Sequence, residues 1–277
     1  MSCFPLLVWA AVALVLFPAR AGEELVLKGG ELELRATWEP LSDTTYGFEK
    51  AYPAIRGLAP AEVTKRHGVE SFRPFLPARP VELGEPWKLE EARLLPLLRQ
   101  LHPGATVELH HDFGAGIAAH GGYALLRAVS PRHAEILFRF HAEFRFPGDA
   151  PGSQVHFTPA QFQGRLVLER ERGEVLRFEL AVPESRANVD VNVGVGDAVS
   201  ADIGRTRLEL TGGVAPDLGP GWREIALEDA RRRLEREFYA CAAIPWLDLP
   251  TALAQARAQD KPLHVVMLFG SLLDESC

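Results

Sequence analysis

Residues 136–146 read Ile-Leu-Phe-Arg-Phe-His-Ala-Glu-Phe-Arg-Phe. Every second side chain is apolar, from Ile136 to Phe146, and most of the positions between them are charged or polar. Successive side chains of a strand point to opposite faces of its sheet. This period of two therefore predicts a β-strand with one buried face and one face in water.

The same alternation recurs after this stretch, at Leu176–Val182, Val189–Val195 and Leu208–Leu210. Glu171-Arg172-Gly173-Glu174 reads as a turn that joins two of the alternating runs. Clean alternation is typical of antiparallel sheets that are buried on one face only. The sequence therefore predicts an antiparallel β-rich domain over residues 106–215.

The segments around this domain show a helical period. Residues 22–105 form a mixed N-terminal region with a helix near Leu89–Leu101, and Pro96 either kinks this helix or marks its true start. Ala215–Gly221 reads as a linker, and a helix with a charged outer face is predicted over Leu227–Ala240. The expected fold class is α+β.

The last stretch, Leu247 to Cys277, has a different order of elements. Asp248 can cap a helix that Lys261-Pro262 ends, because proline cannot continue it. The apolar run Leu263–Phe269 then suits a strand buried on both faces, followed by a short loop that leads to Cys277. Thioredoxin-like domains open with this order, so residues 216–277 are predicted to hold the incomplete start of one.

These residues resemble the selenoprotein N family. Leu263–Cys277 is similar to the family segment that runs into a Ser-Cys-selenocysteine-Gly motif. Further segments are similar in the same order along the chain: Phe157–Gly164, Asn188–Asp190, Asp202–Gly204, Asp229–Glu235 and Ala252–Lys261. The likeness therefore extends from about Phe157 to Cys277.

The resemblance implies where the chemistry lies. Ser276 and Cys277 correspond to the start of the family motif, with Cys277 as the catalytic thiol and selenocysteine expected as the next residue. Selenocysteine is encoded by UGA, so the chain is expected to be truncated at that codon. No other cofactor is expected.

Two functions from different classes follow. The first is an exported or luminal thiol/selenol oxidoreductase that reduces or exchanges the disulfides of a protein substrate through Cys277 and the selenocysteine. The acidic neighbours Asp274 and Glu275 should raise the pKa of the Cys277 thiol, so the printed chain alone should be a poor catalyst. The alternative is a non-catalytic exported binding protein built on the β-rich domain. The codon after Cys277 distinguishes the two.

Residues 1–21 read as a targeting segment. Cys3–Phe17 is apolar throughout, and Ala19-Arg20-Ala21 is a plausible signal-peptidase site, which predicts export. A retained membrane anchor through residues 3–17 is the alternative, although the run is short for a membrane span. Cleavage would leave Cys241, either a small buried hydrophobe or a resolving thiol, and Cys277.

Composition and residue clusters argue against a nucleic-acid-binding protein and against a metal site. The chain of 277 residues has a net charge of −7, and Arg231-Arg232-Arg233 fits a solvated helix face, which argues against a nucleic-acid partner. His110-His111-Asp112 with His120 lacks the spacing of a zinc site, so no metal is expected. Asp190, Asn192 and Asp202 are read as solvated polar positions rather than ligands.

Overall fold

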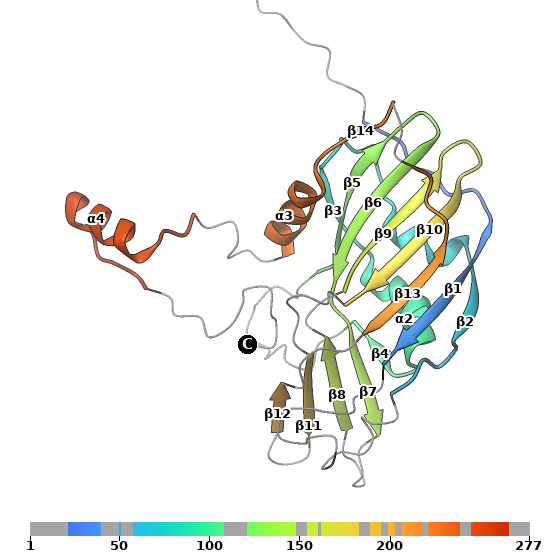
Figure 1. Ribbon diagram of the computed structural model, residues 1–277, viewed down its shortest axis with the longest axis horizontal. Coiled ribbons are helices and arrows are strands. Elements are labelled where there is room, and N and C mark those ends of the chain that lie inside the picture. Colours follow the sequence, from blue (N-terminus) through green and yellow to red (C-terminus); the bar gives the residue numbers. More distant parts are fainter. Residues whose placement is uncertain are drawn as a thin grey trace, which may run out of the picture.

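The computed structural model describes residues 22–39, 50, 58–107, 121–147, 154–159, 162–182, 189–194, 199–202, 207–217, 221–238 and 245–265. Within these ranges the chain forms a large and a small β-sheet and three α-helices, two of which lie against the larger sheet (Figure 1). The predicted signal peptide, residues 1–21, lies outside the described residues.

The larger sheet has nine strands in the order β14-β5-β6-β9-β10-β13-β1-β2, and β3 also pairs with β5. Its strands are β1 Glu31–Trp38, β2 Thr64–Gly68, β3 Pro86–Lys88, β5 Tyr123–Val129, β6 His133–Phe140, β9 Phe162–Glu169, β10 Glu174–Ala181, β13 Leu208–Gly213 and β14 Arg223–Glu224. The smaller sheet runs β12-β11-β8-β7-β4. Its strands are β4 Ala105–Thr106, β7 Glu143–Pro147, β8 Gln154–Pro159, β11 Val189–Gly194 and β12 Val199–Asp202.

The fold class is α+β, as predicted. Every strand pairing in the described ranges is antiparallel. The α-helices are α2 Leu95–Leu101, α3 Leu227–Phe238 and α4 Leu249–Gln259. Short 3-10 turns are η3 Val69–Ser71, η4 Arg73–Phe75 and η5 Glu91–Leu94. Among the described residues, no helix is long and apolar enough to cross a membrane.

The stretch 136–146 that predicted a single strand is divided between the two sheets. β6 ends at Phe140 and pairs with β9 in the larger sheet, whereas β7 begins at Glu143 and pairs with β8 in the smaller one. The four strands therefore form one long hairpin that changes sheets partway along both arms. The turn predicted at Glu171–Glu174 joins β9 to β10, and Gly173 supplies its left-handed residue with φ of 65°.

The N-terminal region shares the sheet and the core of the β-rich segment. β1 pairs with β13 as well as β2, and β3 pairs with β5. One core cluster includes residues from both sides of the boundary that the sequence suggested near residue 105. That boundary therefore does not separate two packing units. The helix expected near Leu89–Leu101 is the turn η5 followed by α2, with Pro96 in the first turn of α2, so Pro96 marks the true start.

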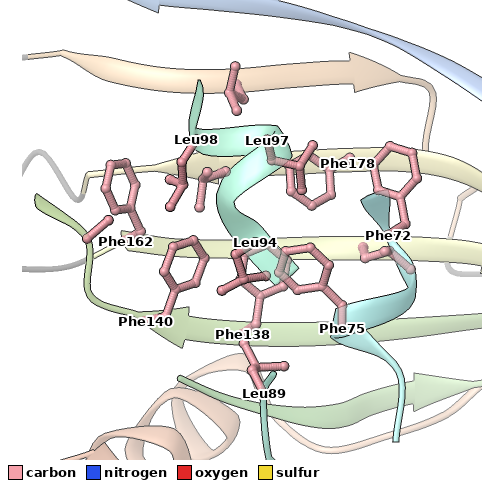
Figure 2. Packing of buried hydrophobic residues seen from close by; sticks show 14 of the residues in the cluster. Phe72, Phe75, Leu89, Leu94, Leu97, Leu98, Phe138, Phe140, Phe162 and Phe178 are labelled. Atoms are coloured by element: carbon pink, nitrogen blue, oxygen red, sulfur yellow. The ribbon is translucent and has the colours of Figure 1, made fainter. Parts of the chain in front are cut away.

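Aromatic side chains fill the core between the larger sheet and the helical turns. Figure 2 shows the rings of the sheet facing residues of α2, η4 and η5. The centroid of the Phe138 ring lies 4.3 Å from that of Phe75 and 5.6 Å from that of Phe178, and all three side chains are at most 1% exposed. Burying a large apolar side chain contributes about 1.5–3 kcal/mol, so this cluster holds η4 and α2 on the sheet.

The outer face of β5 and β6 is also buried, which corrects the prediction that this face lies in water. Helix α3 covers it, and Ala230 and Leu234 of α3 pack on Leu125 and Leu137 (Figure 1). Arg233 strengthens this contact by donating a hydrogen bond from Nη1 to the Gly84 carbonyl, at 2.9 Å. Sequence alternation could not reveal this layer, because most of α3 is charged and its apolar contact is small.

Candidate functional site

The predicted catalytic residues Ser276 and Cys277 lie outside the described residues, as do Cys3 and Cys241. The structure describes the segment that leads toward them, residues 245–265. Its main element is α4, which Figure 1 shows apart from both sheets, and none of whose residues is buried.

Helix α4 is held at its N-terminal end by its own sequence. Asp248 has an extended backbone, and its Oδ1 accepts a hydrogen bond of 2.9 Å from the Thr251 amide. The Thr251 hydroxyl donates to the other carboxylate oxygen at 2.8 Å. The first of these bonds satisfies an amide that the first turn leaves unpaired, and this backbone bond also keeps the pKa of Asp248 below its usual value.

The C-terminal end of α4 is where the sequence predicted it. Asp260 takes the left-handed conformation with φ of 50°, and the Lys261 amide donates to the Ala256 carbonyl at 3.0 Å. A left-handed residue with this bond closes a helix by satisfying its last carbonyls. Lys261-Pro262 then continues in a new direction, so the cap and not proline alone ends the helix.

The described part of α4 and its flanks presents apolar side chains to solvent. The exposed ones are Trp246, Leu247, Leu249, Leu253, Leu263 and Val265. Residues 261–265 belong to no strand or helix, so the described beginning of the predicted strand Leu263–Phe269 is unpaired and exposed. The rest of that strand lies outside the described residues.

The other residues singled out from the sequence fall into two groups. His110, His111, Asp112 and His120 lie outside the described residues. Strand register brings Asp190 of β11 directly opposite Asp202 of β12, with Asn192 two residues further along β11. Among the residues that the structure describes, no group of three or more His, Cys, Asp or Glu could hold a metal ion.

Sequence reasoning missed a row of ion pairs on the outer face of the larger sheet. Glu135 of β6 accepts hydrogen bonds from Arg127 of β5, whose Nη1 also donates to Glu224 at 2.9 Å. On the other side Arg165 lies 3.8 Å from Glu135 and bonds to Glu179, which also accepts from Arg177. The signal for this row is the opposite charges at cross-strand positions, but alternating charged residues fit a solvated sheet face equally well.

The charges in this row are stabilised by one another. Burial opposes ionisation of Glu179, but the bonds from Arg165 and Arg177 outweigh it and hold its pKa below the usual value. The side chains of Arg127 and Glu135 are only 8% and 5% exposed. The row can therefore fix five strands in register, and its positive and negative groups balance one another.

Comparison with known proteins provides the family. No family model and no solved structure matches the chain. It is 29% identical to selenoprotein N of Homo sapiens over 89% of the chain, and 29% identical to that of Mus musculus over 74%. It is 30% identical to selenoprotein N of Danio rerio over 68% of the chain. The chain covers 52%, 46% and 38% of these three relatives, so it spans about half of their length or less. The chain belongs to the selenoprotein N family.

Proposed function

We propose that this chain is part of a thiol/selenol oxidoreductase, similar to selenoprotein N, that works in an exported or luminal compartment. The family relationship carries this proposal, together with the Ser276-Cys277 pair that resembles the start of the family motif. The two sheets would form the body of the protein, and the segment that begins with α4 would lead to the reacting residues.

The proposed chemistry is a two-electron exchange with a protein disulfide. A selenolate at the position after Cys277 attacks one sulfur of the substrate, so that an Se–S bond forms and the substrate S–S bond breaks. The released substrate sulfur takes up a proton. The Cys277 thiolate then attacks the selenium, which forms an intramolecular S–Se bond and releases the second substrate thiol. The substrate gains two electrons, and an external thiol reductant returns them to the protein.

The local charge explains why selenium would be needed. Asp274 and Glu275 precede Ser276-Cys277, and nearby carboxylates disfavour formation of a thiolate. A selenol is a stronger acid than a thiol and ionises at neutral pH without such help. Cys277 would therefore serve better as the second, resolving group than as the first nucleophile.

Substitution of Cys277 tests this proposal in the protein that contains the residues following it. Cys277→Ser is expected to stop turnover of a protein disulfide and to trap the mixed selenenylsulfide, because the resolving thiol is gone. Mass spectrometry of the trapped adduct gives the readout. Cys241→Ser is the matched control: turnover should be kept if Cys241 is a packing residue, and lost turnover would identify Cys241 as the resolving thiol.

Two results would remove the redox proposal. One is a Cys277→Ser variant with unchanged turnover. The other is a codon after Cys277 that is not UGA, followed by no thioredoxin-like sequence. Either result would favour the alternative, an exported binding protein whose function lies in the sheets.

Export is a separate part of the proposal. Cleavage after Ala21 is expected to give a mature chain that begins at Gly22, because Ala19-Arg20-Ala21 has the small residues that signal peptidase requires. Mass analysis of the N-terminal peptide from protein recovered outside the cytoplasm measures this. A chain that keeps Met1 and stays in the membrane fraction would favour the anchor, and one in the cytosol would contradict export.

A further inference from the structure

A buried histidine joins four elements at the edge of the larger sheet. His67 of β2 is 3% exposed, and its Nε2 lies 2.8 Å from Oε1 of Gln100 in α2. Its Nδ1 lies 3.3 Å from the hydroxyl of Ser71 in η3. Gln100 is fully buried and donates from Nε2 to the Leu34 carbonyl of β1 at 2.9 Å. The Ser71–His67–Gln100 chain therefore connects η3, β2, α2 and β1.

The direction of these bonds fixes the tautomer of the neutral histidine. The amide nitrogen of Gln100 donates to Leu34, so its oxygen is left to accept, and His67 must carry its proton on Nε2. Nδ1 then has only a lone pair and accepts from the Ser71 hydroxyl. All bonds of the Ser71–His67–Gln100 chain form when the imidazole is neutral. A second proton on Nδ1 would remove the acceptor, so the Ser71 hydroxyl would have to rotate and accept instead of donate.

The surroundings of His67 do not favour a charged ring. Burial lowers its pKa most strongly, the hydrogen bond with Gln100 opposes this, Lys65 lowers the pKa and Glu62 raises it. Lys65 and Glu62 pair with each other. From the other elements the ring faces neutral groups, namely the Gln100 amide, the Ser71 hydroxyl and the ring of Phe72. Protonation of His67 in place would therefore leave a cation in the interior without a bonded carboxylate.

Because His67 lies on an edge strand, local opening of β2 at acid pH is easier than protonation of His67 in the closed structure. β2 has five residues and, within the described part of the chain, pairs only with β1 at the end of the sheet order. Short edge elements open at lower cost than central strands. Opening exposes His67 to water, where its ordinary pKa of 6.5 applies.

We propose that the Ser71–His67–Gln100 chain is an acid-sensitive latch, which holds β2 and η3 against β1 and α2 and releases them when His67 takes up a proton. The latch is independent of the proposed redox function, because it lies in the sheet body. The stabilisation is complete above about pH 6.5, since both open and closed forms are then neutral, and it is lost as the pH falls below that value.

Hydrogen exchange on the whole chain at pH 7.5 and pH 5.0, corrected for intrinsic exchange rates, tests the latch. In peptides that cover residues 64–76, the corrected exchange should be up to about 30-fold faster at pH 5.0 than at pH 7.5. The reason is that the open form gains a proton that the closed form resists. In peptides from β9 and β10, the corrected exchange should differ much less between the two pH values. In His67→Gln, which cannot titrate, the difference at residues 64–76 should fall below about twofold.

His133→Gln is the matched control, because burial also lowers the pKa of His133 but its ring stacks on Trp222 outside the latch. This variant should keep the full response at residues 64–76. The proposal is overturned if the wild-type chain shows no pH response there, or if His67→Gln keeps it. Should His67→Gln fail to fold, NMR titration of the His67 ring in the wild-type chain decides, and a pKa at or above 6.5 would overturn the latch.

Discussion

Replacing Glu135 by alanine is expected to lower the free energy of unfolding by about 3–5 kcal/mol. The Glu135 carboxylate is 5% exposed and accepts bonds from both Nε and Nη2 of Arg127, which is itself 8% exposed. Without it the Arg127 charge would stay buried beside the half-exposed Glu224. Removing one partner of a buried pair costs more than the pair contributes, because the remaining charge has lost its hydration. Urea unfolding followed by circular dichroism measures the loss.

A second variant separates the buried charge from the packing of the face. Arg127→Met combined with Glu135→Leu should recover most of the lost stability, because two apolar side chains of similar volume leave no buried charge unpaired, and Glu224, which loses Arg127, is half exposed. The matched control is Glu33→Ala. Glu33 is also a strand glutamate paired with an arginine, at 3.4 Å from Arg66, but its side chain is 57% exposed, so the change should stay within about 0.5 kcal/mol. Equal losses for Glu135→Ala and Glu33→Ala would contradict the argument.

The same face of the sheet shows what the sequence could and could not predict. Alternation predicted the strands β10, β11 and β13, and the glycine turn after Arg172 joins β9 to β10 as expected. The change of sheet after Phe140 left no trace in the pattern. β6 and β7 are separated by two residues, so Phe140, Ala142 and Phe144 stay in phase, and all three are buried. A break of an even number of residues preserves a period of two, so alternation alone could not place it.

Burial of the outer face was hidden for a different reason. Charges at Arg127 and Glu135 are normal on a wet face, and only their pairing beneath α3 makes them interior residues. Ala230 and Leu234 are too small an apolar group to reveal which surface α3 covers. The helix α4 was predictable because its signals are local: the Asp248 cap and the Lys261-Pro262 end. The candidate site was predicted only from the family resemblance, because Ser276 and Cys277 indicate a redox site only as the first two residues of the Ser-Cys-selenocysteine-Gly motif.

Replacing Gly164 by alanine is expected to destabilise the protein by about 3 kcal/mol, at the upper end of the cost of overpacking a core. Gly164 is the third residue of β9, opposite Phe138 of β6 on one side and Leu180 of β10 on the other. A Cβ atom there would lie 2.0 Å from the Glu179 carbonyl oxygen and 2.4 Å from Cζ of Phe138. The Phe138 ring is 1% exposed and packs against other rings, so it cannot move away easily.

The two clashes can be separated, because one is with a side chain and the other with backbone. Phe138→Leu removes the contact with the ring but keeps the contact with the Glu179 carbonyl. Adding Gly164→Ala to Phe138→Leu should therefore cost less stability than adding it to the wild-type chain, but should still cost some. Gly68→Ala is the matched control. Gly68 also lies in a strand, has an ordinary φ of −75°, and has open space around its Cα, so alanine should be neutral or stabilise by about 0.4–1 kcal/mol through a less flexible unfolded chain. If Gly164→Ala unfolds at the same urea concentration as Gly68→Ala, β9 does not lie as close to β6 and β10 as the structure has it. Three central strands of the larger sheet would then need a wider spacing, with Phe138 no longer covering the glycine.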